Sequence, residues 1–232
     1  MTFPRTWFDQ EPSRECYERG SIITTDDGTQ WEIRERLKQD DIQRPANSLI
    51  SPSHATLKLR CVKANANPSE RKTSQAFMRV YLQIPHVGSE FEDPETRAAQ
   101  ADRTFQPEEL EAYTILSNHP TVSKFTPQLL GSKVSRQGPS DFVPGGFLII
   151  VVWEHVEGLP LGDLTGNATG YWSLSECERA EGNILYRWYL ALAYFSSSPS
   201  VEFHYRDFIL GWIPLLRAEK GQALVWGFSA YI

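Results

Sequence analysis

Cysteine is scarce in this chain, with 3 cysteines among 232 residues: Cys16, Cys61 and Cys177. They are far apart and odd in number, and they lack the paired spacing of zinc ligands. The sequence therefore predicts three reduced thiols in a reducing compartment, and it predicts neither a disulfide framework nor a zinc site.

Long apolar runs are also missing. The longest, residues 147–153, is far too short to cross a bilayer. Residues 1–5, Met-Thr-Phe-Pro-Arg, do not form a basic segment followed by an apolar one, so we predict no signal peptide. The expected location is the cytoplasm or the nucleus, without membrane contact.

Positive charge is not in excess, because 23 Lys and Arg face 29 Asp and Glu, giving a formal net charge of −6. Such a chain has no general attraction for nucleic acid or anionic lipid. Its 41% of hydrophobic residues is enough for one globular unit with a sizeable core, or for two small lobes.

The first clear elements are strands. Residues 21–25 and 29–37 flank the turn Asp-Asp-Gly, and an Asp-Gly pair between β-rich segments predicts a hairpin. Before this hairpin, residues 1–20 have few periodic apolar positions, which favours a mobile arm or a peripheral helix. After it, residues 38–55 are rich in Pro, Asn and Ser and are predicted to be a loop.

Two further strands are predicted at residues 56–64 and 75–84. The first places alternate apolar side chains on one face, namely those of Leu57, Leu59 and Cys61. An acidic loop at 88–103 should then lead into a helix, since Thr104 is a candidate N-cap and Pro107 suits a first turn. Its expected apolar stripe consists of Leu110, Tyr113 and Leu116.

The second half of the chain is predicted to contain three kinds of element. Residues 125–131 should lead to a short strand, and residues 132–146 should form a turn. A strand buried on both faces should then occupy residues 146–156. A long helix should start at Ser173, where Ser-Leu-Ser-Glu forms a capping box. Short strands should fill the remainder and end in a hairpin.

Several of these segments resemble known sequence motifs. Residues 76–79, Ala-Phe-Met-Arg, occur where kinases have Val-Ala-Ile-Lys, which puts Arg79 in the place of the lysine. Residues 109–116 resemble the glutamate-bearing helix of small-molecule kinases, with Glu109 as the ion-pairing acid. Residues 152–161 resemble the hinge and its following Gly-X-X-Leu segment. Together they resemble the fungal protein-kinase-like family.

The resemblance implies an α+β, protein-kinase-like two-lobe fold. An arm at 1–20 would precede an N-lobe and hinge at 21–157, made of a small antiparallel sheet and one helix. A shortened C-lobe would occupy 158–232. Arg79 and Glu109 would form an ion pair, the alternative being two unrelated surface charges. A ligand pocket would be lined by Phe77, Arg79, Glu109, Glu154 and Val156.

The catalytic loop of the family resembles residues 201–212, in one of two alignments. In the alignment we favour, His204 occupies the position of the catalytic Asp and Ile209 that of the metal-binding Asn. In the other, Asp207 would be the base. In both, Gly227 stands at the second metal-binding Asp.

These replacements oppose phosphoryl transfer, which needs a metal and a positioned base. Magnesium requires hard oxygen ligands, and neither Ile209 nor Gly227 has one on its side chain. No Gly-rich loop, whose backbone would bind the phosphates, lies between residues 37 and 56. The ring of Phe77 should also crowd the adenine of a bound nucleotide.

The sequence therefore predicts a catalytically degenerate interaction or regulatory module without a cofactor. Its expected partners are a protein and a small molecule or nucleotide in a residual pocket. The alternative is a divergent small-molecule phosphotransferase that uses Asp207 or His204 with unusual metal ligands.

Overall fold

The structure is a computed structural model. It describes residues 6–10, 12–13, 15–48, 51–65, 74–118, 120, 123, 126–155, 175–177, 213–214 and 226–227. The chain divides into two compact units. One consists of Met1–Thr114 and Gln128–His155, and the other of Ile115–Pro127 and Val156–Ile232.

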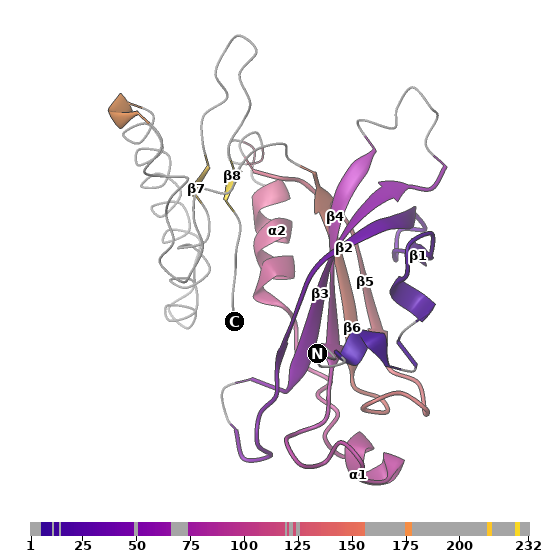
Figure 1. The fold of residues 1–232 in the computed structure, drawn as a ribbon. Helices are drawn as coiled ribbons and strands as arrows, with labels where there is room; N and C mark the ends of the chain where they lie inside the picture. The colour runs from indigo at the N-terminus through magenta and orange to yellow at the C-terminus, as the bar shows by residue number, and fades with distance from the viewer. Residues whose placement is uncertain are drawn as a thin grey trace. The chain divides into compact units, whose positions relative to one another are not determined.

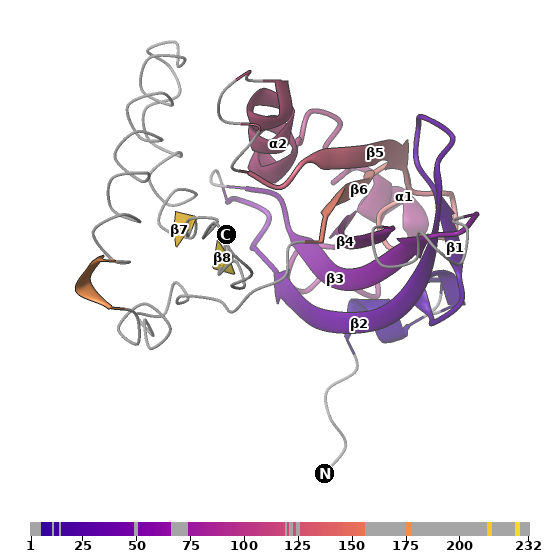
Figure 2. The ribbon, with the colours of Figure 1, turned by 90° about the horizontal axis from the view of Figure 1, so that it is seen from above.

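The first unit is built around one antiparallel sheet of six strands (Figure 1). The strands are β1 (Ile22–Thr24), β2 (Gln30–Ile42), β3 (His54–Lys63), β4 (Gln75–Gln83), β5 (Leu129–Arg136) and β6 (Phe147–Glu154). Their order across the sheet is β1-β2-β3-β4-β6-β5, and every neighbouring pair is antiparallel. Figure 2 shows that β2 and β3 bend strongly, so the sheet curls around its own interior.

The two edges of this sheet meet. The backbone N–H of Asp26, just after β1, donates to the carbonyl of Ser132 on β5 at 2.8 Å. The carboxylate of Asp26 also accepts from the backbone N–H of Val134 at 3.0 Å. Thr25 packs directly over Gly131, where a Cβ atom would lie 3.1 Å from the Thr25 hydroxyl oxygen. These contacts make the sheet a nearly closed barrel.

Alternate residues of the strands fill the barrel. On β3 these are Ala55, Leu57, Leu59 and Cys61, which are at most 1% exposed, as the predicted alternation requires. The same core includes apolar side chains from the other strands, namely Trp31, Ile33, Ala76, Met78, Val80, Leu82, Ile150 and Val152. Burial in this interior raises the pKa of the Cys61 thiol to about 12, which makes it an inert packing residue.

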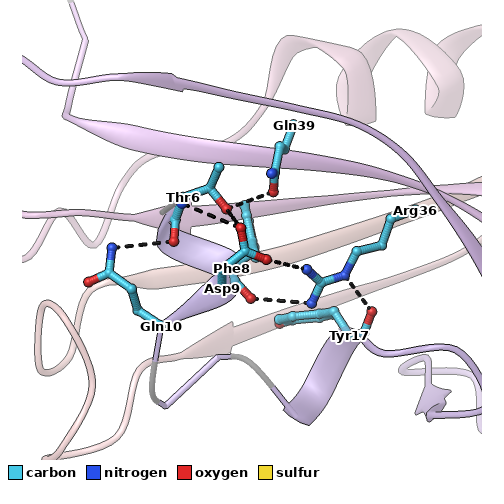
Figure 3. A network of polar contacts seen from close by, with 7 residues as sticks. All are labelled: Thr6, Phe8, Asp9, Gln10, Tyr17, Arg36 and Gln39. Carbon is cyan, nitrogen blue, oxygen red and sulfur yellow. Dashed lines mark hydrogen bonds and ion pairs between the residues drawn. The ribbon is translucent and has the colours of Figure 1, made fainter. Parts of the chain in front are cut away.

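The N-terminal segment completes this core. It contains the 3-10 helices η1 (Trp7–Asp9) and η2 (Glu15–Tyr17), and it buries Phe8 and Tyr17 with exposed fractions of 1% and 4%. Arg36 on β2 holds the segment, because its guanidinium donates to the carbonyls of Phe8 and Tyr17 and pairs with Asp9 at 2.8 Å (Figure 3). The sequence predicted a mobile arm or a peripheral helix here. Phe8 and Tyr17 are too far apart in the sequence to form the repeating apolar pattern of a buried helix or strand.

Several predicted elements are confirmed. The hairpin of β1 and β2 turns at Gly28, whose φ of +83° is a conformation that glycine adopts readily. The strands β3, β4 and β6 occur where the sequence placed them. The helix α2 (Glu108–Asn118) follows Pro107, and its predicted stripe of Leu110, Tyr113 and Leu116 is buried.

Three predicted loops contain regular structure. Residues 38–42 continue β2, which passes two irregular pairings at Ile33/Glu35 and Arg36/Lys38. The acidic loop at 88–103 includes the short helix α1 (Pro94–Ala98), capped by the carboxylate of Asp93. The predicted turn at 132–146 begins with the second half of β5. In each case pairing or capping within the fold outweighed local composition.

The predicted protein-kinase-like two-lobe fold is wrong. The described residues form mostly a six-stranded antiparallel sheet that nearly closes into a barrel, with few helices and no helical C-lobe. The pattern of alternating apolar residues and turn residues predicted most of the strands. It did not predict that residues 25 and 26 reach across to β5 and join the sheet's edges.

Little of the second unit is described. The long helix predicted from Ser173 lies outside the described residues except at 175–177, where Glu176 and Cys177 are helical. The strands β7 (Ile213–Pro214) and β8 (Trp226–Gly227) pair antiparallel, with Ile213 opposite Gly227, in agreement with the predicted terminal hairpin. In the described part of the chain no helix has the length and apolar character to cross a membrane.

Gly146 provides a test of how tightly the barrel's end is packed. A Cβ atom there would lie 2.7 Å from the Gln83 side-chain oxygen and 2.9 Å from the Val143 carbonyl. Gln83 cannot move freely, because that oxygen accepts from the backbone of Asp102 and Phe147. We expect Gly146→Ala to destabilise the protein by about 1–3 kcal/mol in urea denaturation, as overpacking does.

The matched control is Gly138→Ala, whose Cβ would make ordinary contacts with Asp141 at 3.5 Å and beyond. It should change the free energy of unfolding by no more than about 0.5 kcal/mol. Equal effects of the two substitutions would contradict the packing described for Gly146.

Candidate functional site

The candidate site lies on the outer face of the sheet, opposite the barrel core. Successive side chains of a strand point to opposite faces, so Phe77, Arg79 and Tyr81 on β4 point away from the core residues between them. Arg79 is paired in register with Lys58 on β3 and with Val151 on β6. The site therefore combines side chains from three adjacent strands and from the start of α2.

An ion pair between β4 and α2 forms the centre of the site. Arg79 Nη1 lies 2.9 Å from Glu109 Oε2, and the two side chains are 11% and 2% exposed. The hydroxyl of Tyr81 donates to the same oxygen at 2.6 Å. The predicted ion pair is confirmed, and the alternative of two unrelated surface charges is wrong.

Burial and charge shift the proton affinities of this cluster. Burial raises the pKa of Tyr81, and the neighbouring carboxylate of Glu109 raises it further. Burial is the largest single influence and opposes the charge of Arg79, but Glu109, Tyr81 and Tyr113 together outweigh it, so the pKa of Arg79 lies above its ordinary value. Arg79 therefore stays charged at neutral pH, and Tyr81 stays a hydrogen-bond donor.

Helix α2 is positioned by residues at a spacing of four. Glu109 lies in its acidic first turn, and Tyr113 follows on the same face one turn later. The ring of Tyr113 stacks on Trp153 of β6, with centroids 5.5 Å apart and an interplanar angle of 23°. Arg79 also lies 5.6 Å from the Trp153 ring, within the range of a cation–π contact.

Lys58 is the functional candidate that the sequence did not reveal. Its Nζ lies 4.7 Å from the ring centroid of Phe77 and 5.9 Å from that of Trp153. Burial lowers its pKa to about 8, and the charge of Arg79 lowers it too, while Glu109 acts in the opposite direction. Among the described residues, no carboxylate forms an ion pair with Lys58.

The site therefore holds two cations and one carboxylate beside aromatic rings. A lysine between Leu57 and Leu59 on an alternating strand is typical of a solvent-facing position, so it gave no signal in the sequence. The register of β3 against β4 is what places it beside Arg79.

The other residues predicted to line the pocket are placed differently. Phe77 is part of the site, and its ring also lies 4.7 Å from that of His155. Glu154 is exposed and pairs in register with Ala76, a barrel-core residue, so the structure does not bring it to Phe77 and Arg79. Val156 lies outside the described residues.

The predicted catalytic and metal positions remain predictions. His204, Asp207 and Ile209 lie outside the described residues, and Gly227 is placed in β8 opposite Ile213. Within the described ranges, no three His, Cys, Asp or Glu side chains lie close enough together to hold a metal ion.

His54 borders this face and should make the fold sensitive to acid. It is 4% exposed, its Nδ1 lies 3.0 Å from the Pro52 carbonyl, and its ring lies beside those of Tyr81 and Phe105. Burial lowers its pKa, and the charge of Arg44 adds to this effect, whereas the bond to Pro52 opposes it.

A lowered pKa in the folded state means that the neutral ring is favoured there. Its contribution to stability is complete above the ordinary pKa of about 6.5 and is lost as pH falls below it. We expect His54→Gln to have a smaller loss of unfolding free energy than the wild type between pH 7 and pH 5, measured by urea denaturation. Parallel pH profiles of the two proteins would contradict this assignment.

No family model matches the chain, and no curated protein matches it either. The interpretation of the site therefore depends on its geometry and chemistry.

Proposed function

We propose that this chain is a non-catalytic interaction or regulatory module that binds a small anionic ligand at the site of Lys58 and Arg79. The observation that carries the proposal is the excess positive charge beside aromatic rings. Glu109 neutralises one of the two cations, and Lys58 has no ion-pairing carboxylate among the described residues. A half-buried cation of this kind gains from an anion that it can contact directly.

The aromatic rings favour a ligand with a flat group. Phe77 and Trp153 flank the amine of Lys58, with Phe77 half-buried and Trp153 only 3% exposed. Aromatic side chains bind planar groups by stacking, and the cations beside them would bind a phosphate or carboxylate. A nucleotide or another aromatic phosphate is the ligand class that combines both features.

The wider role is proposed on the same basis. A ligand that bridges β3 and β4 would stabilise the first unit and could thereby control the binding of a protein partner in the cytoplasm or nucleus. The resemblance of residues 76–79 and 109–116 to fungal kinase-like proteins stays a prediction, and the ligand proposal does not depend on it. The phosphotransferase alternative depends on His204 and Asp207, which lie outside the described residues.

A thermal-shift titration with ATP, with and without magnesium, tests the proposal. At ten times the dissociation constant, binding adds about 1.4 kcal/mol of stability. For a chain of this size that is a rise in Tm of about 3–6 °C. We expect the rise to be the same without magnesium.

The Lys58→Met variant should bind ATP about tenfold more weakly, because one charge-assisted contact is lost. The control is Lys63→Met, an exposed lysine on the same strand, which should bind as the wild type does. Absence of any shift would contradict the binding proposal. A shift that requires magnesium, together with turnover of ATP, would instead favour the phosphotransferase.

A further inference from the structure

The amine of Lys58 has the surroundings of a reactive nucleophile. It lies on the outer face of β3, directly opposite Arg79, with the rings of Phe77 and Trp153 beside its Nζ. The residue is half-buried, so its side chain is partly desolvated and also keeps some exposed surface. This combination differs from that of Lys38, which is exposed and paired with Asp40 at 3.2 Å.

These surroundings favour the neutral amine, which carries the lone pair that attacks electrophiles. Burial removes water from the ammonium ion and the guanidinium of Arg79 repels it, and these two effects exceed the attraction of the rings of Phe77 and Trp153. Burial lowers the pKa of Lys58 to about 8, so a substantial fraction is neutral near physiological pH. Arg79 keeps its charge under the same conditions because Glu109 stabilises it.

We propose that Lys58 is a nucleophilic amine that captures anionic aldehydes as a reversible imine. Its nitrogen lone pair forms a bond to the carbonyl carbon, and the carbonyl oxygen takes up a proton from the nitrogen, giving a carbinolamine. Loss of water then forms the carbon–nitrogen double bond, so amine plus aldehyde gives imine plus water. No oxidant or reductant is required.

The anionic group of the aldehyde is needed for selectivity. The guanidinium of Arg79, which lies opposite Lys58 in the strand register, favours an incoming phosphate or carboxylate. The half-buried ring of Phe77 favours an aldehyde carried on a flat aromatic group. This inference rests on the proposed function, since it assumes that the anionic ligand binds at the same site.

Pyridoxal 5′-phosphate is a suitable probe, because it combines a phosphate, an aromatic ring and an aldehyde. The purified full chain is treated with a limiting amount, reduced with borohydride to fix the imine, and mapped by peptide mass spectrometry. We expect Lys58 to be modified about tenfold or more faster than the exposed Lys63 on the same strand. The rate should rise with pH and level off above about 8.

Two variants control the assignment. Lys58→Arg removes the primary amine, so modification at this position should disappear. Lys63→Arg should leave the rate at Lys58 unchanged. A neutral aromatic aldehyde should modify Lys58 more slowly than the phosphorylated one, and equal rates would overturn the anion preference.

Pyridoxine 5′-phosphate separates the two proposals, because it has an alcohol in place of the aldehyde and can only bind without a covalent bond. If it binds in calorimetry but Lys58 is modified no faster than Lys63, the reactive amine is overturned and the proposed function stands. If it does not bind and modification is unselective, both are overturned.

Discussion

Replacing Glu109 by leucine is expected to lower the free energy of unfolding by about 3–5 kcal/mol. The substitution leaves the guanidinium of Arg79 without its carboxylate, in a position where the Arg79 side chain is 11% exposed. It also removes the acceptor of the Tyr81 hydroxyl, which is buried with it. Urea denaturation monitored by the fluorescence of the tryptophans would measure the loss.

A double variant distinguishes a lost ion pair from a general packing defect. When Arg79→Met is combined with Glu109→Leu, no buried charge remains, and much of the stability should return. The control pair is Glu35 and Arg60 on the outer surface, with side chains 47% and 43% exposed. Glu35→Gln should cost about 1 kcal/mol or less. A double variant as unstable as Glu109→Leu would show that the charges are not the cause.

Replacing Phe8 by alanine should cost about 3–5 kcal/mol, although this residue lies in a segment with little regular structure. Its ring is 1% exposed, packs edge-on against Tyr17 at 5.6 Å, and belongs to the same core as the barrel strands. The smaller residue would leave a cavity that the rigid sheet cannot fill. Urea denaturation again provides the measurement.

Gln10→Ala is the matched control, because Gln10 is half-buried in the same segment and makes one long hydrogen bond of 3.3 Å to the Thr6 carbonyl. It should change stability by about 0.5 kcal/mol or less. If Phe8→Ala were equally mild, the N-terminal segment would contribute little to the core, and the first unit should fold without it.

Local patterns were sufficient to predict most strands and the helix α2. Leu57, Leu59 and Cys61 alternate strictly, and Asp26-Asp27-Gly28 carries its own turn chemistry, so neither depends on distant residues. The ion pair of Glu109 and Arg79 could be predicted because the family resemblance places both residues at ion-pairing positions. No local pattern indicates that these two residues, 30 positions apart, lie close together. Their ion pair is present, although the two-lobe fold that the same resemblance implied is not.

What could not be predicted depends on register and on contacts between distant segments. Lys58 belongs to the site because it lies opposite Arg79, and a sequence does not state which residues of two strands lie opposite each other. Phe8 and Tyr17 enter the core from a segment whose composition is polar. The two irregular pairings of β2 shift its register, and alternation alone does not locate such shifts.

The junction between the end of β1 and β5 also has a consequence for how the chain folds. The bond between Asp26 and Val134 joins residues 108 positions apart in the sequence. Contacts of such long range form slowly, because the intervening chain must first lose much of its conformational freedom. The hairpins β2-β3, β3-β4 and β5-β6 are local, so they should assemble first, and the seam at Asp26 should close last. Until it closes, β1 and β5 are unprotected edges, and newly made chains should be most prone to aggregation during that interval.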